Sequence, residues 1–330
     1  PSSGKFGCSC LDAESGSKIG STSVTFEQLQ LDEKKIKRVL PYIDPIKTAD
    51  VGIRAIASKA TESCGSQDYA CQVNGVYRYV VENHRYVNDP LTQIVQKPEE
   101  TLKVEGGDCE DFTILMNSML ENLGIETAVV LTPGHAYGVA CNIDTVKLKE
   151  VAYQSLLEYQ AKKYSESSKG AAEVIGDAVW WKTDQESSFA MFGGGFLYQS
   201  ISNFDTSRFS SASISYKVSA PFAINVYVFP SDNDRVAFEA GSSFQEYSSC
   251  RKNNVVNPSS RCDGVGPGAV ILAQRLPGSG SEQVLKLETT RLYKFSESAL
   301  PDPVEISTYD LGGRDCVVLD GTLGPYGYPG

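Results

Sequence analysis

The stretch GGDCEDFTILMNSMLENLGIETAVVLTPGHAY, residues 106–137, decides the fold. Its first half holds the most regular helix pattern in the chain, because apolar residues recur at helical spacing over 109–123. A Gly-Gly-Asp turn and cap precede this helix, and Gly124 stops it. The stretch therefore predicts an amphipathic helix that begins at a cysteine, Cys109.

The pattern changes to strands after this helix. Two apolar runs, 125–131 and 135–143, flank the turn Thr132-Pro133-Gly134, which predicts an antiparallel hairpin. Helices are also expected over 25–64 (in two pieces broken at Pro41 and Pro45), 70–87 and 146–168. Strand-like runs separated by Gly, Ser, Asn and Pro clusters then predict an antiparallel β-sandwich over roughly 177–298, and a last hairpin follows at 304–322.

Cys109 lies where a thiol nucleophile is usually placed. A helix N-terminus lowers a thiol pKa through its dipole and unpaired N–H groups, and the N–H of Cys109 itself would be free to bind an oxyanion. The chain has two histidines, and one of them would have to act as the base. His84 falls beside the apolar face of a helix and is expected to be packed. His135 opens a strand after a turn, where catalytic groups are commonly presented.

The segment 106–137 resembles the transglutaminase-like core of archaeal and bacterial secreted proteins. The shared pattern is G-x-C-x-[DE], an amphipathic helix ending in Leu-Gly-Ile, a strand, and then His-Ala. VYRYVVENHRYVNDP (76–90), PEETL (98–102) and CVVLDGTLG (316–324) also match it. The resemblance implies a papain-like core in which Cys109 is the nucleophile, His135 the base and Asp320 the group that orients the base. It also implies a supporting hydrogen-bond role for Asp111.

The spacing of the last two residues departs from the family. His135 and Asp320 are 185 residues apart, where the family has a short hairpin. We expect an insertion between the two strands that carry them. If His135 faces Asp320 on neighbouring strands, Cys141 and Cys316 come close enough for a cross-strand disulfide. Asp184 is the runner-up for the orienting carboxylate, and Asp144 is a third candidate.

The expected fold class is therefore α+β, with a discontinuous core. Residues 1–24 are expected to form an extended arm, 25–145 and 299–330 the transglutaminase-like core, and 146–298 an inserted segment with a polar helix and a β-sandwich.

The cysteine count indicates an oxidising compartment. Nine cysteines are many for a reduced cytosol, and an odd count leaves one thiol free if the others pair. The pairs Cys64/Cys71 and Cys250/Cys262 are close in sequence and are candidate local disulfides. No C-x-x-C pair occurs, so neither a metal nor a cofactor is expected. We expect an extracellular or cell-surface protein, and removal of a secretion signal would fit the cysteines.

The charge narrows the class of partner. A net charge of -11 argues against binding to nucleic acid or to an anionic membrane, and no apolar run has transmembrane length. The expected activity is thiol-dependent acyl transfer on a protein or peptide amide, as a peptidase, an amidase or a cross-linking enzyme. The alternative is a catalytically silent surface-assembly protein that uses the fold as a scaffold and whose Ser/Gly arm and Gly/Tyr tail contact its neighbours.

Overall fold

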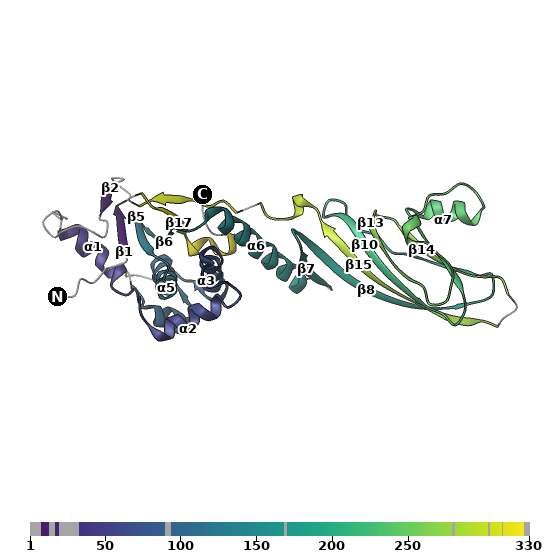
Figure 1. The fold of residues 1–330 in the computed structure, drawn as a ribbon, viewed down its shortest axis with the longest axis horizontal. Coiled ribbons are helices and arrows are strands. Elements are labelled where there is room, and N and C mark those ends of the chain that lie inside the picture. The colour runs from purple at the N-terminus through teal and green to yellow at the C-terminus, as the bar shows by residue number, and fades with distance from the viewer. Residues whose placement is uncertain are drawn as a thin grey trace. The chain divides into compact units, whose positions relative to one another are not determined.

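The chain divides into two compact units. A computed structural model describes residues 8–12, 17–19, 33–89, 94–167, 170–278, 281–302, 304–311 and 313–326, with side chains between residues 38 and 324. The first unit contains Pro1–Leu156 and Pro303–Gly330, and the second contains Leu157–Asp302. Both combine helices with mainly antiparallel sheets, in agreement with the expected α+β class (Figure 1).

The first unit is built around a six-stranded sheet with the order β16-β17-β6-β5-β1-β2. Its elements are β1 (Cys8–Asp12), β2 (Ser17–Ile19), α1 (Glu33–Ile43), α2 (Val51–Ala60), α3 (Tyr69–Asn83), β3 (Arg85–Tyr86), α4 (Pro98–Val104), β4 (Gly106–Gly107), α5 (Cys109–Asn122), β5 (Thr127–Thr132), β6 (His135–Cys141), β16 (Thr308–Asp310), β17 (Asp315–Leu319) and the 3-10 helix η4 (Gly321–Tyr326). Two strands, β1 and β2, lie within the N-terminal segment that was expected to be an arm, and its other residues lie outside the described part. Helix α6 (Thr145–Ser167) begins in the first unit and ends in the second.

The core of the first unit lies between the helices and one face of the sheet. Helix α5 packs on α2, α3 and β6 (Figure 1). Its middle residues Leu115, Met116 and Met119 are fully buried. Side chains alternate across the sheet, so Ala140 of β6 joins this core while Val139 joins a separate cluster on the opposite face. Helix α5 is buried on all sides and not on one apolar face alone, because its polar residues Thr113, Asn117 and Ser118 are buried as well.

Two expected helix boundaries were wrong. Helix α1 continues through Pro41, and the chain breaks only after Ile43, because the Asp44 N–H still donates to the Leu40 carbonyl and preserves the last turn. The helix expected to reach residue 87 ends at Asn83. The next residues form β3, which pairs with β4, so a tertiary hydrogen-bonded pairing overrides the apolar periodicity there.

The second unit contains two antiparallel sheets with the orders β13-β10-β15-β8-β7 and β12-β11-β14-β9. Its elements are β7 (Ala171–Ile175), β8 (Ala178–Met191), β9 (Phe196–Ser200), β10 (Phe209–Ser219), β11 (Ile224–Phe229), α7 (Asp232–Glu239), the 3-10 helix η2 (Ser248–Cys250), β12 (Lys252–Val255), β13 (Ser259–Val265), β14 (Val270–Arg275), β15 (Gln283–Phe295) and the 3-10 helix η3 (Glu297–Ala299). Residues of both sheets share one apolar core, including Ile214, Val226 and Leu287. Helix α7 was not expected from the sequence; Ser231 caps it, and its Phe238 packs on Tyr227.

Three disulfides join the described cysteines. They are Cys64–Cys71, Cys141–Cys316 and Cys250–Cys262, which are the three pairs named from the sequence. Cys141 and Cys316 lie directly opposite each other on β6 and β17, and both are buried. Cys109 is a free thiol, and the side chains of Cys8 and Cys10 lie outside the described part.

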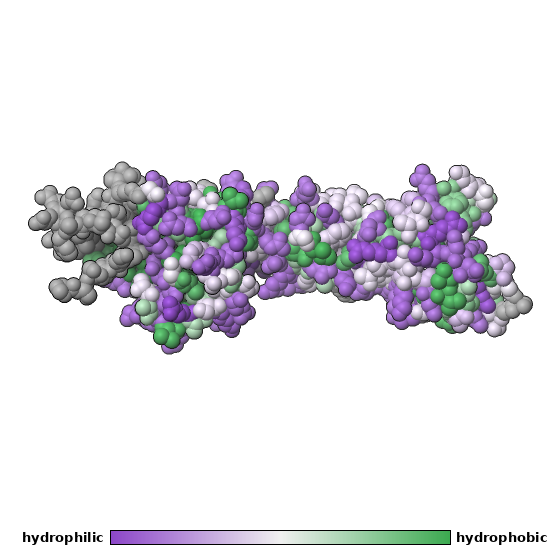
Figure 2. All heavy atoms as spheres, in the orientation of Figure 1, coloured by the Kyte–Doolittle hydropathy of each residue, from purple (hydrophilic) through white to green (hydrophobic). Residues whose placement is uncertain are grey.

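The surface is mainly hydrophilic. Hydrophilic side chains dominate the face in Figure 2, and apolar ones form small separate groups. In the described ranges, none of the helices is both long enough and apolar enough to cross a bilayer.

The Cys141–Cys316 disulfide should stabilise the first unit more than Cys64–Cys71 does. It closes a sequence separation of 175 residues against 7, and the entropy removed from the unfolded chain grows with loop length. We expect the double serine variant at Cys141 and Cys316 to lose about 4–5 kcal/mol of unfolding free energy, and the control variant at Cys64 and Cys71 about 2–3 kcal/mol. Hydrogen exchange of amides in α5 and β6, measured at increasing urea concentrations, reports the unfolding free energy of the first unit and checks this order. Equal losses of unfolding free energy in the two variants would contradict it.

Candidate active site

Cys109 is the first residue of α5, at the point where the helix meets the sheet. Strand β17 ends at Leu319 opposite Gly138, which leaves the backbone of Ala136 free to bind the helix. The Ala136 N–H donates to the Cys109 sulfur, and its carbonyl accepts from the hydroxyl of Thr113 at 3.3 Å. The thiol therefore lies beside the residue that follows His135.

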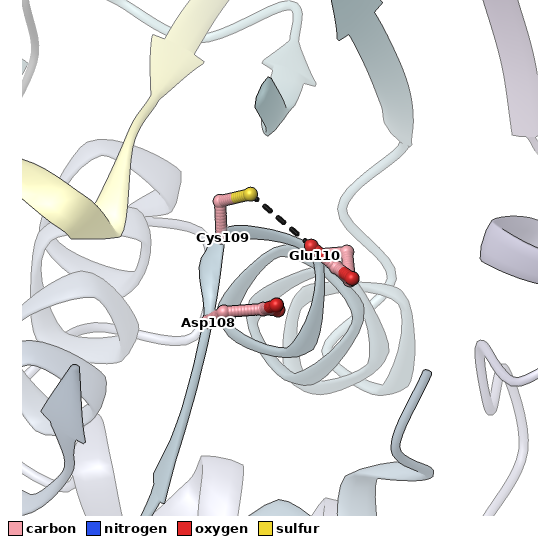
Figure 3. Close-up of side chains that lie close together, drawn as sticks. All are labelled: Asp108, Cys109 and Glu110. Atoms are coloured by element: carbon pink, nitrogen blue, oxygen red, sulfur yellow. Dashed lines mark hydrogen bonds between the residues drawn. The ribbon is translucent and has the colours of Figure 1, made fainter. Parts of the chain in front are cut away.

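The thiol itself donates to a carboxylate. Its Sγ lies 3.1 Å from Oε2 of Glu110 (Figure 3), and in the described part of the chain it makes no hydrogen bond to His135. Burial is the largest cause that raises the pKa of Cys109, to about 12, and the Glu110 hydrogen bond and the charges of Glu110 and Asp108 act in the same direction. The lowered pKa expected from the helix N-terminus was therefore wrong for this state, because desolvation and two carboxylates outweigh the dipole.

Asp108 and Glu110 are buried acidic residues that precede and follow Cys109 in sequence, and their side chains lie close to each other beside the thiol (Figure 3). Burial, followed by a hydrogen bond to Glu110 and its charge, raises the pKa of Asp108 to about 8. Ligand atoms of Asp108, Cys109 and Glu110 lie within 4.8 Å of one another, and Oδ1 of Asp108 is buried with no hydrogen-bond partner. These three residues have the donor atoms to hold a divalent cation.

Asp111 fixes the turn that leads into α5. Its fully buried carboxylate accepts from the backbone and side-chain N–H groups of Gln96, at 2.8 and 2.7 Å, and from the Asp108 N–H at 3.3 Å. A Cβ on Gly107 would lie 2.5 Å from the Cβ of Asp111, so this close approach requires glycine. These contacts hold the turn ahead of Cys109, and a supporting role of Asp111 in the site stays a prediction.

His135 is paired with Asp320. Its Nε2 lies 2.7 Å from Oδ2 of Asp320, across 185 residues of sequence. The other oxygen of Asp320, Oδ1, accepts from the N–H and the hydroxyl of Thr322, at 3.0 and 2.7 Å. The buried Tyr77 hydroxyl lies 3.0 Å from the Asp320 carbonyl, and these contacts orient the carboxylate toward the imidazole. Among the described residues, Nδ1 is the ring nitrogen that this contact leaves without a hydrogen-bond partner.

The other candidates occupy different sites. Asp184 lies on β8 in the second unit, where its Oδ1 accepts from Thr290 at 2.5 Å. Asp144 accepts from the N–H of Lys147 at the start of α6. His84 follows α3, is buried beside Phe112, and has a pKa lowered by desolvation. In the described residues, His135 is hydrogen-bonded to Asp320 and to none of these.

The sequence did not assign several groups around the thiol. Glu110 accepts a hydrogen bond from the thiol, and a carboxylate oxygen of Asp108 lies within 4.8 Å of its sulfur. The acidic residues on both sides of Cys109 in Gly-Asp-Cys-Glu-Asp (107–111) were the sequence signal that could have indicated an acidic environment for the thiol. Tyr42 and Tyr86 also lie close by: burial, with smaller contributions from the negative charges at Asp108, Cys109 and Glu110, raises the pKa of both.

A known protein family matches the part of the chain that contains Cys109 and His135. Residues 54–184 match the family model described as the transglutaminase-like superfamily. The resemblance read from the sequence is therefore confirmed over this range, which contains Cys109, His135 and Asp184 and stops before Asp320. None of the curated proteins compared with the chain matches it.

Two solved structures are distantly similar. One belongs to work on Bacillus endospore appendages that form disulfide-linked pili, with 9% identity, coverage of 39% of this chain and 100% of that chain, and a TM-score of 0.24. The other is a low-affinity xylan-binding module, CBM86, from Roseburia intestinalis, with 11% identity, coverage of 40% and 87%, and a TM-score of 0.20. At these TM-scores the likenesses carry no argument about fold or function.

The Glu110 contact predicts a pH profile for the thiol. Because the pKa of Cys109 is raised to about 12, its iodoacetamide alkylation rate should rise about tenfold per pH unit from 7 to 10 without a plateau. Removing the negative charge in Glu110→Gln lowers the thiol pKa, so alkylation at pH 8 should become at least about tenfold faster. The control is Glu99→Gln, which removes an exposed carboxylate on α4. EDTA is present in all samples to remove any cation bound beside the thiol. A plateau below pH 8.5 in the parent protein would contradict the raised pKa.

Proposed function

We propose that this protein catalyses thiol-dependent acyl transfer on peptide or side-chain amides, with Cys109 as nucleophile, His135 as base and Asp320 as the residue that orients the base. The observation that carries the proposal is the 2.7 Å contact between His135 Nε2 and Asp320 Oδ2, with the thiol of Cys109, on α5, beside Ala136, the residue that follows His135. His135 and Asp320 are far apart in sequence, and they form this contact near the N-terminus of α5, where Cys109 is a free thiol.

The proposed chemistry follows from these positions. The thiol turns from Glu110 toward Nδ1 of His135 and transfers its proton there, and the resulting thiolate attacks the amide carbonyl. Asp320 stabilises the imidazolium that forms. The N–H of Cys109 has no acceptor within the helix and is a donor for the oxyanion. The amine leaves with the proton from His135, and water or a second amine then resolves the thioester. Hydrolysis and transfer share the first half of this sequence.

The proposal includes a domain organisation. The first unit would be a papain-like core interrupted between β6 and β17, and the second unit would be an inserted β-sandwich. The division of the chain at residues 156 and 303 and the apolar core shared by the two sheets of the second unit support this arrangement. Three disulfides are consistent with an extracellular protein, and the proposed substrate is a protein or peptide in that compartment.

A second candidate function is a catalytically silent surface protein. The observation that favours it is the thiol itself, which is half-buried and hydrogen-bonded to Glu110. In that case Cys109 would be a packed side chain and the His135–Asp320 pair would serve stability alone.

Acylation by an activated ester separates the two candidates without knowledge of the substrate. We expect p-nitrophenyl acetate to acetylate Cys109, detected by peptide mass spectrometry, and the acetyl group to turn over. His135→Ala and Asp320→Asn should slow acylation by about 10²–10⁴-fold, as removal of a base or its orienting carboxylate does. The control is Asp184→Asn, which should match the parent protein.

A protein without catalytic function gives a different result. If acetylation of Cys109 is equally slow in the parent, His135→Ala and Asp320→Asn proteins, all with intact disulfides and unchanged circular dichroism, then the catalytic proposal fails and the silent candidate stands.

A further inference from the structure

The second unit contains a cavity that the proposed acyl transfer does not use. It has a volume of about 420 Å³, within the ~300–1,000 Å³ range of small-molecule sites. Strands β8, β10 and β15 and the loop between β9 and β10 form its walls. The lining residues are the aromatic Trp181, Phe204, Phe209 and Tyr293 and the polar Asn203, Asp205 and Arg208.

The aromatic residues form one continuous wall. Trp181 and Tyr293 are directly opposite each other on β8 and β15. The rings of Phe204 and Phe209 lie 5.5 and 5.6 Å from that of Tyr293. The Gly170 backbone packs against Trp181, since a Cβ there would lie 2.4 Å from Cζ2 of the indole. Within the described residues the indole has no aromatic partner, and it packs against the apolar core of the unit, so the cavity is bounded by a supported, partly buried aromatic ring.

The polar residues supply both donors and acceptors. The Oδ1 atom of Asp205 accepts from the N–H and hydroxyl of Ser207, at 2.9 and 2.7 Å, which fixes the carboxylate. The guanidinium carbon of Arg208 lies 4.9 Å from the Tyr164 ring centroid, and this side chain forms no ion pair in the described part. The amide of Asn203, likewise judged on the described residues, has no hydrogen-bond partner. The aromatic wall is therefore bordered by a carboxylate that accepts hydrogen bonds, a guanidinium with five N–H donors, and an amide that both donates and accepts.

This combination selects a chemical class of ligand. Asp205 and Arg208 carry opposite charges, so the cavity favours neither an anion nor a cation. A wholly apolar ligand would leave their hydrogen-bonding groups without partners and is disfavoured. A sugar ring has an apolar C–H face for the indole and hydroxyls that donate and accept. We propose that this cavity binds a neutral pyranoside, which is a carbohydrate-binding activity of the second unit.

The chain offers its own fluorescent reporter for a test. It contains two tryptophans, Trp180 and Trp181, which are adjacent on β8 and therefore point to opposite faces of the sheet. Trp180→Phe leaves Trp181 as the single reporter, and Trp181→Phe leaves Trp180 as the matched control. Each full-length variant is titrated with methyl glycosides of glucose, mannose, galactose, xylose and N-acetylglucosamine to tens of millimolar, and with soluble polysaccharides of the same sugars.

The proposal predicts a saturable emission change in Trp180→Phe with at least one of these probes and none in Trp181→Phe. Asp205→Ala and Arg208→Ala, made in the Trp180→Phe protein, should each weaken binding at least tenfold without lowering the unfolding midpoint. Binding to a polysaccharide but not to its methyl glycoside would assign the site to a chain-internal sugar.

Three outcomes overturn the proposal. The first is no saturable change with any probe in a folded Trp180→Phe protein. The second is the same change in Trp181→Phe. The third is sugar binding that neither Asp205→Ala nor Arg208→Ala weakens. None of these outcomes bears on the acyl-transfer proposal, because the cavity contains neither Cys109, His135 nor Asp320.

Discussion

The antiparallel pairing of β17 with β6 is the constraint on which the candidate site depends. It brings Asp320 to His135 across 185 residues, and the Cys141–Cys316 disulfide fixes the register a few residues away. Closing so long a loop costs entropy, although the cost grows only slowly with length. The buried disulfide offsets part of it. The early end of β17 also leaves the Ala136 backbone free, and this backbone is where the start of α5 and its thiol attach.

The state of the thiol depends on opposing electrostatic effects. The helix N-terminus and the Ala136 N–H favour a thiolate, whereas burial and the charges of Glu110 and Asp108 favour a thiol. The second group of effects is larger in the structure, so a resting nucleophile here would be neutral. An enzyme of this kind would need a change at Glu110 before its chemistry begins, and a silent protein would need none. The two functional candidates therefore differ in whether the Glu110 carboxylate releases the thiol.

The sequence predicted the parts of the fold that rest on local patterns. Helix α5 and the β5–β6 hairpin carry strong periodicity and turn residues, and the disulfide pairs follow from strand register and short spacing. It did not predict β3, where pairing with Gly106–Gly107 overrides helical periodicity, or α7, whose eight residues lie between strands of the second unit. The position of Asp320 came from a family pattern, because no local signal can join strands separated by a whole folded unit.

The sequence could not predict the environment of the thiol for a related reason. A helix N-terminus can be recognised from a Gly-Gly-Asp cap, but the direction of the Glu110 side chain depends on packing that no spacing rule describes. The supporting contacts of Asp111 with Gln96 are likewise tertiary, since they join residues on either side of α4.

The pairing of His135 with Asp320 can be measured directly by long-range ¹H–¹⁵N correlation of the imidazole rings, since the chain has only two histidines to assign. The account predicts that His135 in the parent protein shows an exchange-protected Nε2–H proton shifted downfield by a hydrogen bond. This signal should be lost in Asp320→Asn and kept in Asp184→Asn. A signal that survives in Asp320→Asn, or that disappears in Asp184→Asn, would contradict the account.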